Sequence, residues 1–125
     1  YVGHFKQAEQ DGNGTLYFDN GQIDYQGEWK QGEMDGQGTA YFRETGNKRY
    51  VGHLTKGKMD GNGTEYFVDG QIDYQGEWKQ GKADGQGTTY YLKTGNKRYV
   101  GHFKQGKQDG NGTLYSDSGQ IDYQG

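Results

Sequence analysis

The five-residue motif Asp-Gly-Asn/Gln-Gly-Thr is the stretch of this chain whose residue types most suggest ion chemistry. In its first copy, residues 11–15, oxygen-bearing side chains stand at alternate positions, which is the spacing that begins the calcium loop of an EF-hand. An EF-hand loop starting at Asp11 needs glycine at its sixth position and glutamate at its twelfth, but the chain has Leu16 and Gln22 there. The motif is therefore interpreted as a turn, with no metal and no other cofactor.

The histidines are the second candidates for metal binding or catalysis. In the antiparallel sheet argued for below, successive histidines lie four strands apart, about 19 Å, so no two of them can share an ion. They are expected to alternate with amides and glutamates in one polar, solvent-facing row: His4, Asn13, Glu28, Gln37, His53, Asn62, Glu77, Gln86 and His102. With no Ser/His/Asp set, no paired inward carboxylates and no P-loop, the chain is predicted not to be an enzyme.

Composition limits the class of protein. The 125 residues are predicted to form one domain, residues 1–125, in which 12 Tyr, 2 Trp and 25 Gly take the place of an aliphatic core. The net charge of -3, with both signs interspersed, argues against nucleic acid as a partner, and the absence of cysteine excludes disulfides and thiolate metal sites. No apolar run has membrane-spanning length, and residues 1–20 show no signal-peptide core, which favours the cytoplasm.

Internal repetition decides the architecture. The Asp-Gly motif recurs at Asp11, Asp35, Asp60, Asp84 and Asp109, each time ten residues after a tyrosine in YVGH or YQGE. The repeats, alternately of 24 and 25 residues, are 1–24, 25–49, 50–73, 74–98 and 99–122, followed by the start of a sixth at 123–125. The unit of variation is therefore a pair of repeats.

A known family shares this pattern. The stretch YQGEWKQGKADGQGTTYY, residues 74–91, resembles a MORN repeat, whose pattern is Y-x-G-x-W/F, a glycine turn, G-x-G and an aromatic residue. The resemblance covers the whole chain in phase, although Ala8 replaces the turn glycine of the first copy and Ser116 replaces the late aromatic of the fifth. It implies a module for protein interaction or dimerisation, and also membrane association.

Residue alternation leads to the same fold. The period of two in Tyr1–Lys6 and Gly12–Phe18 indicates strands, so we predict an all-β, single-layer, twisted antiparallel meander of about ten strands. A four-residue loop at 7–10 places Lys6 opposite Asp11 and Phe5 opposite Gly12.

The other connections are predicted from turn chemistry. A type I′ turn at Asn20-Gly21 places Phe18 opposite Ile23, Leu16 opposite Tyr25 and Gly12 opposite Trp29. The longer copies have three-residue loops, 44–46 and 93–95, ending in a left-handed glycine, and these keep all the tyrosines on one face.

These registers predict rows across the sheet. One is a ladder of alternating charge: Lys6, Asp11, Lys30, Asp35, Thr55, Asp60, Lys79, Asp84, Lys104 and Asp109. On the opposite face runs a glycine row: Gly3, Gly14, Gly27, Gly38, Gly52, Gly63, Gly76, Gly87, Gly101, Gly112 and Gly125. Rings flanking this row are expected to lean over the glycines and stiffen the sheet.

The same face provides the leading functional hypothesis, a non-catalytic scaffold that binds a protein or peptide segment. A single sheet has no second layer, so apolar surface is expected to stay exposed in a groove. The predicted groove residues are Tyr25, Trp29, Tyr50, Leu54, Tyr74, Trp78, Tyr99 and Phe103, over a floor of Gly27, Gly38, Gly52, Gly63, Gly76, Gly87 and Gly101.

Three alternatives stay open at this point. Phospholipid binding would use the repeated basic pairs Lys48-Arg49 and Lys97-Arg98, whose other role is solubility near a hairpin loop. Carbohydrate binding would use the aromatic residues for stacking on sugars. Self-association through edge strands or end to end is expected if the terminal strands are uncovered.

Overall fold

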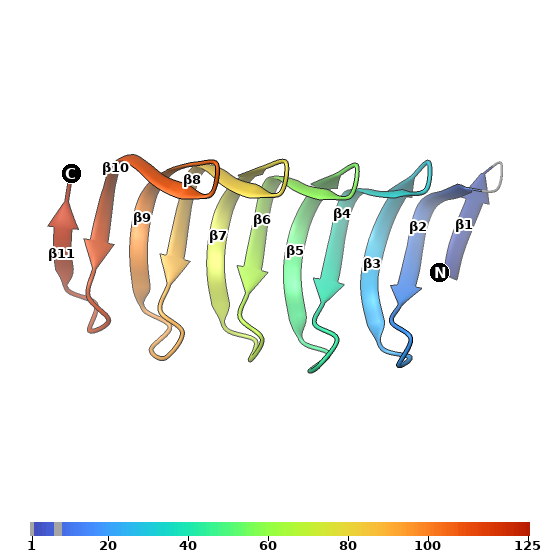
Figure 1. Cartoon of the computed structure of the whole chain (residues 1–125), viewed down its shortest axis with the longest axis horizontal. Helices are drawn as coiled ribbons and strands as arrows, with labels where there is room; N and C mark the ends of the chain where they lie inside the picture. The colour runs from blue at the N-terminus through green and yellow to red at the C-terminus, as the bar shows by residue number, and fades with distance from the viewer. Residues whose placement is uncertain (1, 7–8) are drawn as a thin grey trace.

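A computed structural model of the chain describes residues 2–6 and 9–125, with side chains from residue 11 onward. These residues form one sheet of eleven antiparallel strands, in which each strand pairs with the next one along the chain (Figure 1). The strands are β1 (Val2–Lys6), β2 (Glu9–Tyr17), β3 (Ile23–Lys30), β4 (Glu33–Tyr41), β5 (Lys48–Thr55), β6 (Lys58–Tyr66), β7 (Ile72–Lys79), β8 (Lys82–Tyr90), β9 (Lys97–Lys104), β10 (Lys107–Tyr115) and β11 (Ile121–Gln124). The predicted all-β meander is confirmed.

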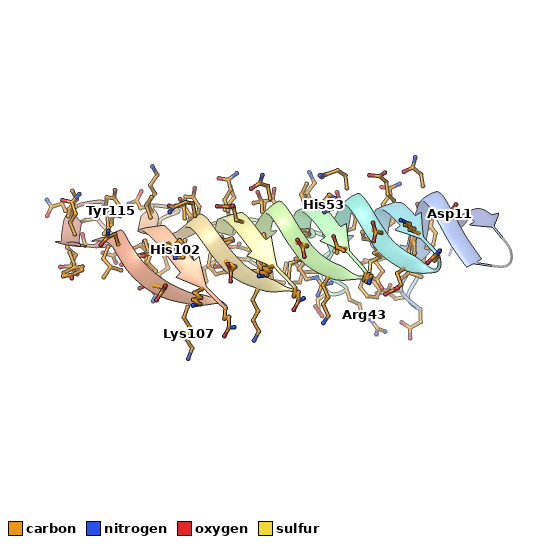
Figure 2. All side chains as sticks on the ribbon, turned by 90° about the horizontal axis from the view of Figure 1, so that it is seen from above. Asp11, Arg43, His53, His102, Lys107 and Tyr115 are labelled. Atoms are coloured by element: carbon orange, nitrogen blue, oxygen red, sulfur yellow. The ribbon has the colours of Figure 1, made fainter. Side chains whose placement is uncertain are left out.

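The sheet is a long ribbon with the two chain ends at its opposite ends (Figure 1). Seen from above, the strands cross the long axis obliquely and side chains project from both faces (Figure 2). Across the described ranges there is no helix with the length and apolar character needed to span a bilayer. No second layer covers either face in these views, so whatever core the fold has must form on the ribbon itself.

The edge of the sheet at the top of Figure 1 carries two-residue turns, which we call the turn edge. Lys30 pairs with Glu33, and the residues between them, Gln31 and Gly32, have φ angles of 50° and 82°. Two positive φ angles define a type I′ turn. Three further turns repeat this geometry, at 56–57, 80–81 and 105–106. The predicted four-residue loop is therefore wrong, and Lys6 pairs with Glu9 and Phe5 with Gln10.

The Asp-Gly motif is a bulge rather than a turn. Gly27 pairs with Gly38 and Trp29 with Met34, so the three residues 35–37 stand opposite Glu28 alone. Gly36, inside the bulge, has a φ of 104°, a conformation that favours glycine. Its Cα is nevertheless in regular register with Leu54 of the next strand.

The bulge also changes the predicted charge ladder. Within each hairpin the lysine faces the residue after the turn and not the aspartate, so Lys79 pairs with Lys82 and Lys104 with Lys107. Those steps of the ladder are wrong. The physical reason is that the extra residues move each aspartate out of register with the preceding strand.

The opposite edge, the loop edge, also differs from prediction. Phe18 accepts a hydrogen bond from the Gly21 amide and donates one to the Gln22 carbonyl, and only Gly21 has a positive φ. The loop is thus a three-residue connection ending in a left-handed glycine, and Ile23 pairs with Tyr17 instead of Phe18.

The longer repeats use four-residue loops, 43–46 and 92–95, instead of three. They end in Gly46 and Gly95 with φ of 76° and 74°, which confirms the predicted left-handed glycines. The extra residue is absorbed in the loop, so the tyrosines keep their common face. Leu16 opposite Tyr25 and Gly12 opposite Trp29 are confirmed as well.

The glycine row is confirmed along the whole sheet. Each of its glycines pairs with the next, from Gly3 with Gly14 to Gly101 with Gly112, and Gly112 and Gly125 exchange backbone hydrogen bonds. The sheet face with this row is the inner face, and the face with the histidines is the outer face.

Candidate functional site

Tyrosine rings fill the predicted trough. A Cβ added at Gly27 or Gly38 would overlap the ring or hydroxyl of Tyr25, and Tyr50 relates to Gly52 and Gly63 in the same way. The rings therefore lie over the glycine backbone. This confirms that rings cover the glycines, and it leaves no open trough with a bare backbone floor beneath Tyr25, Tyr50, Tyr74 or Tyr99.

The tyrosine hydroxyls are held by the backbone of their own strand. Tyr25 donates to the Glu28 carbonyl at 3.0 Å, Tyr50 to the His53 carbonyl at 2.8 Å and Tyr74 to the Glu77 carbonyl at 2.7 Å. Burial raises the pKa of each of these three phenols to about 12. The phenols are therefore neutral donors at physiological pH and are unsuited to act as general bases.

The larger apolar side chains complete the same layer. Trp29 Nε1 donates to the Gly14 carbonyl at 3.2 Å and Trp78 Nε1 donates to the Gly63 carbonyl at 3.1 Å. The Trp78 ring meets Tyr50 and Tyr74 edge to face, with centroids 5.7 and 4.9 Å away. All eight residues predicted to line a groove are buried, so their first role is to form the core of a one-layer sheet.

Two hollows remain on the inner face above this core. The first, about 240 Å³, is lined by Met34, Leu54 and Met59 and by charged Asp24 and Arg49. The second, about 430 Å³, lies over Trp78, Ala83 and Phe103 and shares Glu65 with the first. Because Met34, Met59 and Ala83 are only partly buried against the core, they supply the accessible apolar surface of these hollows.

Carboxylates in the hollows have disturbed ionisation. Desolvation raises the pKa of Glu65, with a further rise from Asp73 and an opposing effect of Arg49. Desolvation also raises the pKa of Asp24 and of Asp73, opposed by Arg49 and Arg98 respectively. The inner face therefore combines an apolar floor with partly desolvated charges.

The predicted basic pairs do not stand on the loops. Lys48-Arg49 begins β5 and Lys97-Arg98 begins β9. Arg49 lines the first hollow, and the Arg98 guanidinium lies 5.8 Å from the centre of the Tyr91 ring. Asp24 and Asp73 occupy the positions of Arg49 and Arg98 in the alternate repeats, so basic and acidic residues alternate along the loop edge.

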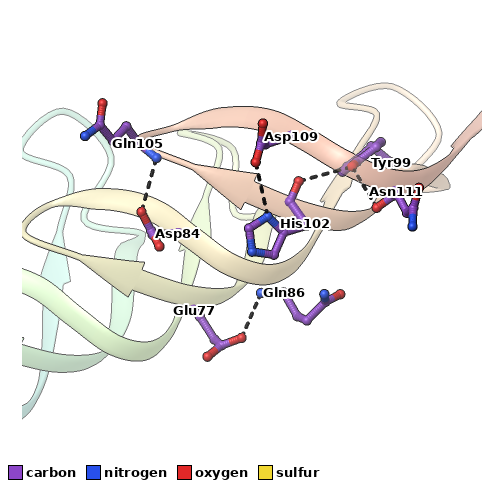
Figure 3. A network of polar contacts seen from close by, with 8 residues as sticks. All are labelled: Glu77, Asp84, Gln86, Tyr99, His102, Gln105, Asp109 and Asn111. Atoms are coloured by element: carbon purple, nitrogen blue, oxygen red, sulfur yellow. Dashed lines mark hydrogen bonds and ion pairs between the residues drawn. The ribbon is translucent and has the colours of Figure 1, made fainter. Parts of the chain in front are cut away.

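The outer face holds a polar hydrogen-bonded stripe, as predicted. Glu77 accepts the Gln86 amide at 2.7 Å inside the bulge, and His102 Nδ1 lies 3.7 Å from Asp109 (Figure 3). Glu28 and Gln37 repeat the bulge contact, whereas His4 falls outside the described side chains. From residue 11 onward, no cluster of His, Asp or Glu suits a metal ion.

Two aspartates of the Asp-Gly motif accept hydrogen bonds from backbone amides. Asp84 Oδ2 accepts the amide of Gln105 at 3.2 Å, and Asp35 Oδ2 accepts that of Lys56 at 3.2 Å (Figure 3 shows the first). Each bond ties a bulge to the turn of the following hairpin. Sequence reasoning missed this contact between repeats. The signal that could have found it is the spacing of 21 residues that separates Asp35 from Lys56 and Asp84 from Gln105.

Sequence reasoning also missed the residue directly before each inner-face tyrosine. Tyr25 pairs with Leu16 and Ile23 with Tyr17, which leaves Asp24 unpaired between them. Such a bulge residue can turn toward the same face as its neighbour. In the first hollow, Asp24 and Arg49 therefore line the wall beside Tyr25 and Tyr50.

Comparisons with known proteins agree with this architecture. The family model for the MORN repeat matches residues 1–23, 25–44, 50–72, 74–92 and 99–121. A comparison with curated proteins gives no match. Five matches in phase cover most of the chain, and each matched segment contains one strand pair of the meander. The chain therefore belongs to the MORN repeat family.

Proposed function

We propose that this chain is a non-catalytic scaffold that binds a segment of another protein along its inner face. Membership of the MORN family supports a repeat protein of the kind often involved in binding. The observation that carries the proposal is the pair of neighbouring hollows, in which half-buried Met34, Met59 and Ala83 lie beneath charged walls. An apolar floor with a charged rim is the usual anatomy of a protein-binding surface, and methionine adapts to varied partners.

The aromatic residues support this surface from below. Because Tyr25, Trp29 and Trp78 are buried and hydrogen-bonded, replacing them with alanine would remove core packing along with any contact to a partner. A loss of binding in such variants would not separate the two causes. The test must therefore use residues that line the hollows without holding the sheet together.

The experiment is a selection of peptides from a displayed random library against the intact chain, followed by affinity measurement on variants. Met59→Lys places a charge on the floor of the first hollow, and Gln26→Lys places the same charge on the exposed outer face. We expect the first change to weaken the selected peptides at least about tenfold and the second to leave them unchanged. Equal affinity for both variants would contradict inner-face binding.

A further inference from the structure

A row of charges that alternate in sign runs along the inner face beside the tyrosines. The residue before the tyrosine is Asp24 in β3, Arg49 in β5, Asp73 in β7 and Arg98 in β9. Each sits where the strand register shifts, one residue before a buried tyrosine. The pairing of repeats into two subtypes thus appears on this face as a regular electrostatic pattern.

The charges of the row, all on described side chains, make no ion pair with one another, although the Arg98 guanidinium lies 5.8 Å from the centre of the Tyr91 ring. Within the part of the chain described with side chains, the ion pairs closed within 4.0 Å are Arg43 with Asp19 and His102 with Asp109, neither of which uses the row. Asp24 and Asp73 are half-buried, while Arg49 and Arg98 are exposed. Charges that are partly desolvated and fixed in a regular spatial order interact more strongly with a ligand of complementary charge than scattered surface charges do.

The spacing of the row selects a backbone conformation. Members of the row stand two strands apart, about 9.6 Å at roughly 4.8 Å per strand. A polyproline II segment has three residues per turn and rises about 3.1 Å per residue, so every third residue faces the same way at about 9.3 Å. Over the three steps from Asp24 to Arg98 the accumulated mismatch is only about 1 Å.

Other conformations match the row less well. In an α-helix the seventh residue returns to the same face after about 10.5 Å, with a drift of about 20° per step, so the mismatch reaches about 3 Å over three steps. In an extended strand every third residue points to the opposite face. Spacing therefore favours the polyproline II segment.

We propose that the inner face binds a polyproline II segment whose every third residue is charged, in the order positive, negative, positive, negative from Asp24 to Arg98. This inference rests on the proposed function, and it names the conformation and charge order of the partner. The charge order also fixes direction, since the reversed peptide in the same register brings like charges together. Its positive residues face Asp24 and Asp73, and its negative residues face Arg49 and Arg98.

The surroundings of the row strengthen one position. Glu65 lies in both hollows, next to Asp73, so the positive residue that faces Asp73 meets two carboxylates. Lys58 and Lys82 also line the hollows. Because both are positive, they do not determine where the alternating charges of the peptide lie along the row. We therefore expect the third charged position of the peptide to matter most.

The test compares two synthetic ten-residue peptides of identical composition, KPPEPPKPPE and KPPKPPEPPE, each labelled with a fluorophore. The expected result is at least about fivefold tighter binding of the first at low salt, with the difference shrinking as salt rises. Asp73→Arg should weaken the first peptide and tighten the second, because it reverses the sign at one site for both. The thermal midpoint of this variant is measured alongside, to show that the sheet is intact.

Three outcomes would overturn the inference. These are equal affinity of the two peptides, absence of binding by either, or stronger charge-order discrimination by a helical peptide with Lys and Glu at heptad spacing. None of them contradicts the proposed function, which depends on the selected peptides and the Met59→Lys variant.

Discussion

The pentapeptide Ile-Asp-Tyr-Gln-Gly occurs three times, at 23–27, 72–76 and 121–125, with three different degrees of burial. Its tyrosine is 0% exposed at Tyr25 and 4% exposed at Tyr74, but 62% exposed at Tyr123. The local sequence is identical, so local propensity cannot cause the difference. The first two copies are followed by β4 and β8, whereas β11 is the last strand of the sheet. A repeat is thus completed by its neighbour, as in other repeat arrays.

The neighbouring strand supplies a glycine directly beneath the tyrosine ring. Gly38 of β4 and Gly87 of β8 lie beneath the rings of Tyr25 and Tyr74, and any larger residue would occupy the space of the ring. The core of this protein therefore consists of ring-on-backbone contacts across a strand pair, and not of side chains meeting between two layers. Four predictions test this comparison.

Gly38→Ala should have the largest effect. The new methyl overlaps the fully buried Tyr25 ring, and Gly38 has an ordinary φ, so the cost is steric and not conformational. Forcing the ring aside should lower the free energy of unfolding by about 3 kcal/mol, measured by urea titration.

The matched control is Gly125→Ala, whose methyl would lie 2.7 Å from the hydroxyl of exposed Tyr123. That ring can move into solvent, so we expect a change of about 0.5 kcal/mol or less. Equal losses at Gly38 and Gly125 would contradict the idea that the covering strand completes each repeat.

Alkaline pH should be the next most damaging change. Burial raises the pKa of Tyr25, Tyr50 and Tyr74 to about 12, whereas an unfolded tyrosine titrates near 10. Between about pH 10 and pH 12 the unfolded state therefore binds fewer protons than the folded state, and stability falls as pH rises.

We expect a loss on the order of 2 kcal/mol between pH 8 and pH 11, followed by circular dichroism during urea unfolding. Tyrosinate absorbance recorded in the same samples gives the control. If the phenols ionised near pH 10 while the sheet stayed folded, these rings would not be buried.

The glycine row was predictable from the sequence, whereas the charge ladder and most of the turns were not. The glycine row from Gly3 to Gly125 depends on a period of two and on the loops of the longer repeats absorbing their extra residue, so it emerges even where the turn type is predicted wrongly. The turns depend on which residues accept positive φ. Asn20-Gly21 carried the strongest type I′ signal, yet Gln31-Gly32 forms that turn and Asn20 does not have a positive φ.

The candidate site was predicted in position but not in packing. The aromatic and glycine residues were correctly placed on one face. Whether a ring stands beside the glycine row or lies on it depends on side-chain rotamers and on the hydroxyl's reach to a carbonyl, such as that of Glu28, three residues on. The sequence pattern specifies neither the rotamer of the ring nor the hydrogen-bond partner of its hydroxyl. The hollows over Met34 and Met59 follow from that packing, which is why they were missed.

Tyr74→Phe should be milder than the glycine change. It removes the hydroxyl that donates to the Glu77 carbonyl at 2.7 Å while keeping the ring, so the loss should be about 1 to 1.5 kcal/mol. Tyr123→Phe, on the exposed copy of the same pentapeptide, should cost almost nothing. Thermal unfolding of the two variants measures the difference, and a larger cost at Tyr123 would reverse the order predicted from burial.

The smallest effect is expected at Glu65, the residue of β6 that lies between two inner-face tyrosines. Glu65 pairs with both Tyr50 and Tyr74, at a position filled by Ala40 in the preceding repeat. Because burial raises the pKa of Glu65, its carboxylate lowers stability at neutral pH, and this cost disappears below about pH 4, where unfolded glutamate is also protonated. Glu65→Leu should therefore stabilise the chain by about 1 kcal/mol at pH 7 and by less at pH 4.

Ala40→Glu should have the opposite effect and lower stability at pH 7, since Ala40 is 7% exposed. If Glu65→Leu destabilised the sheet, the attraction between Glu65 and Arg49 would outweigh desolvation, and the inner face would be held together by its charges as well as its rings.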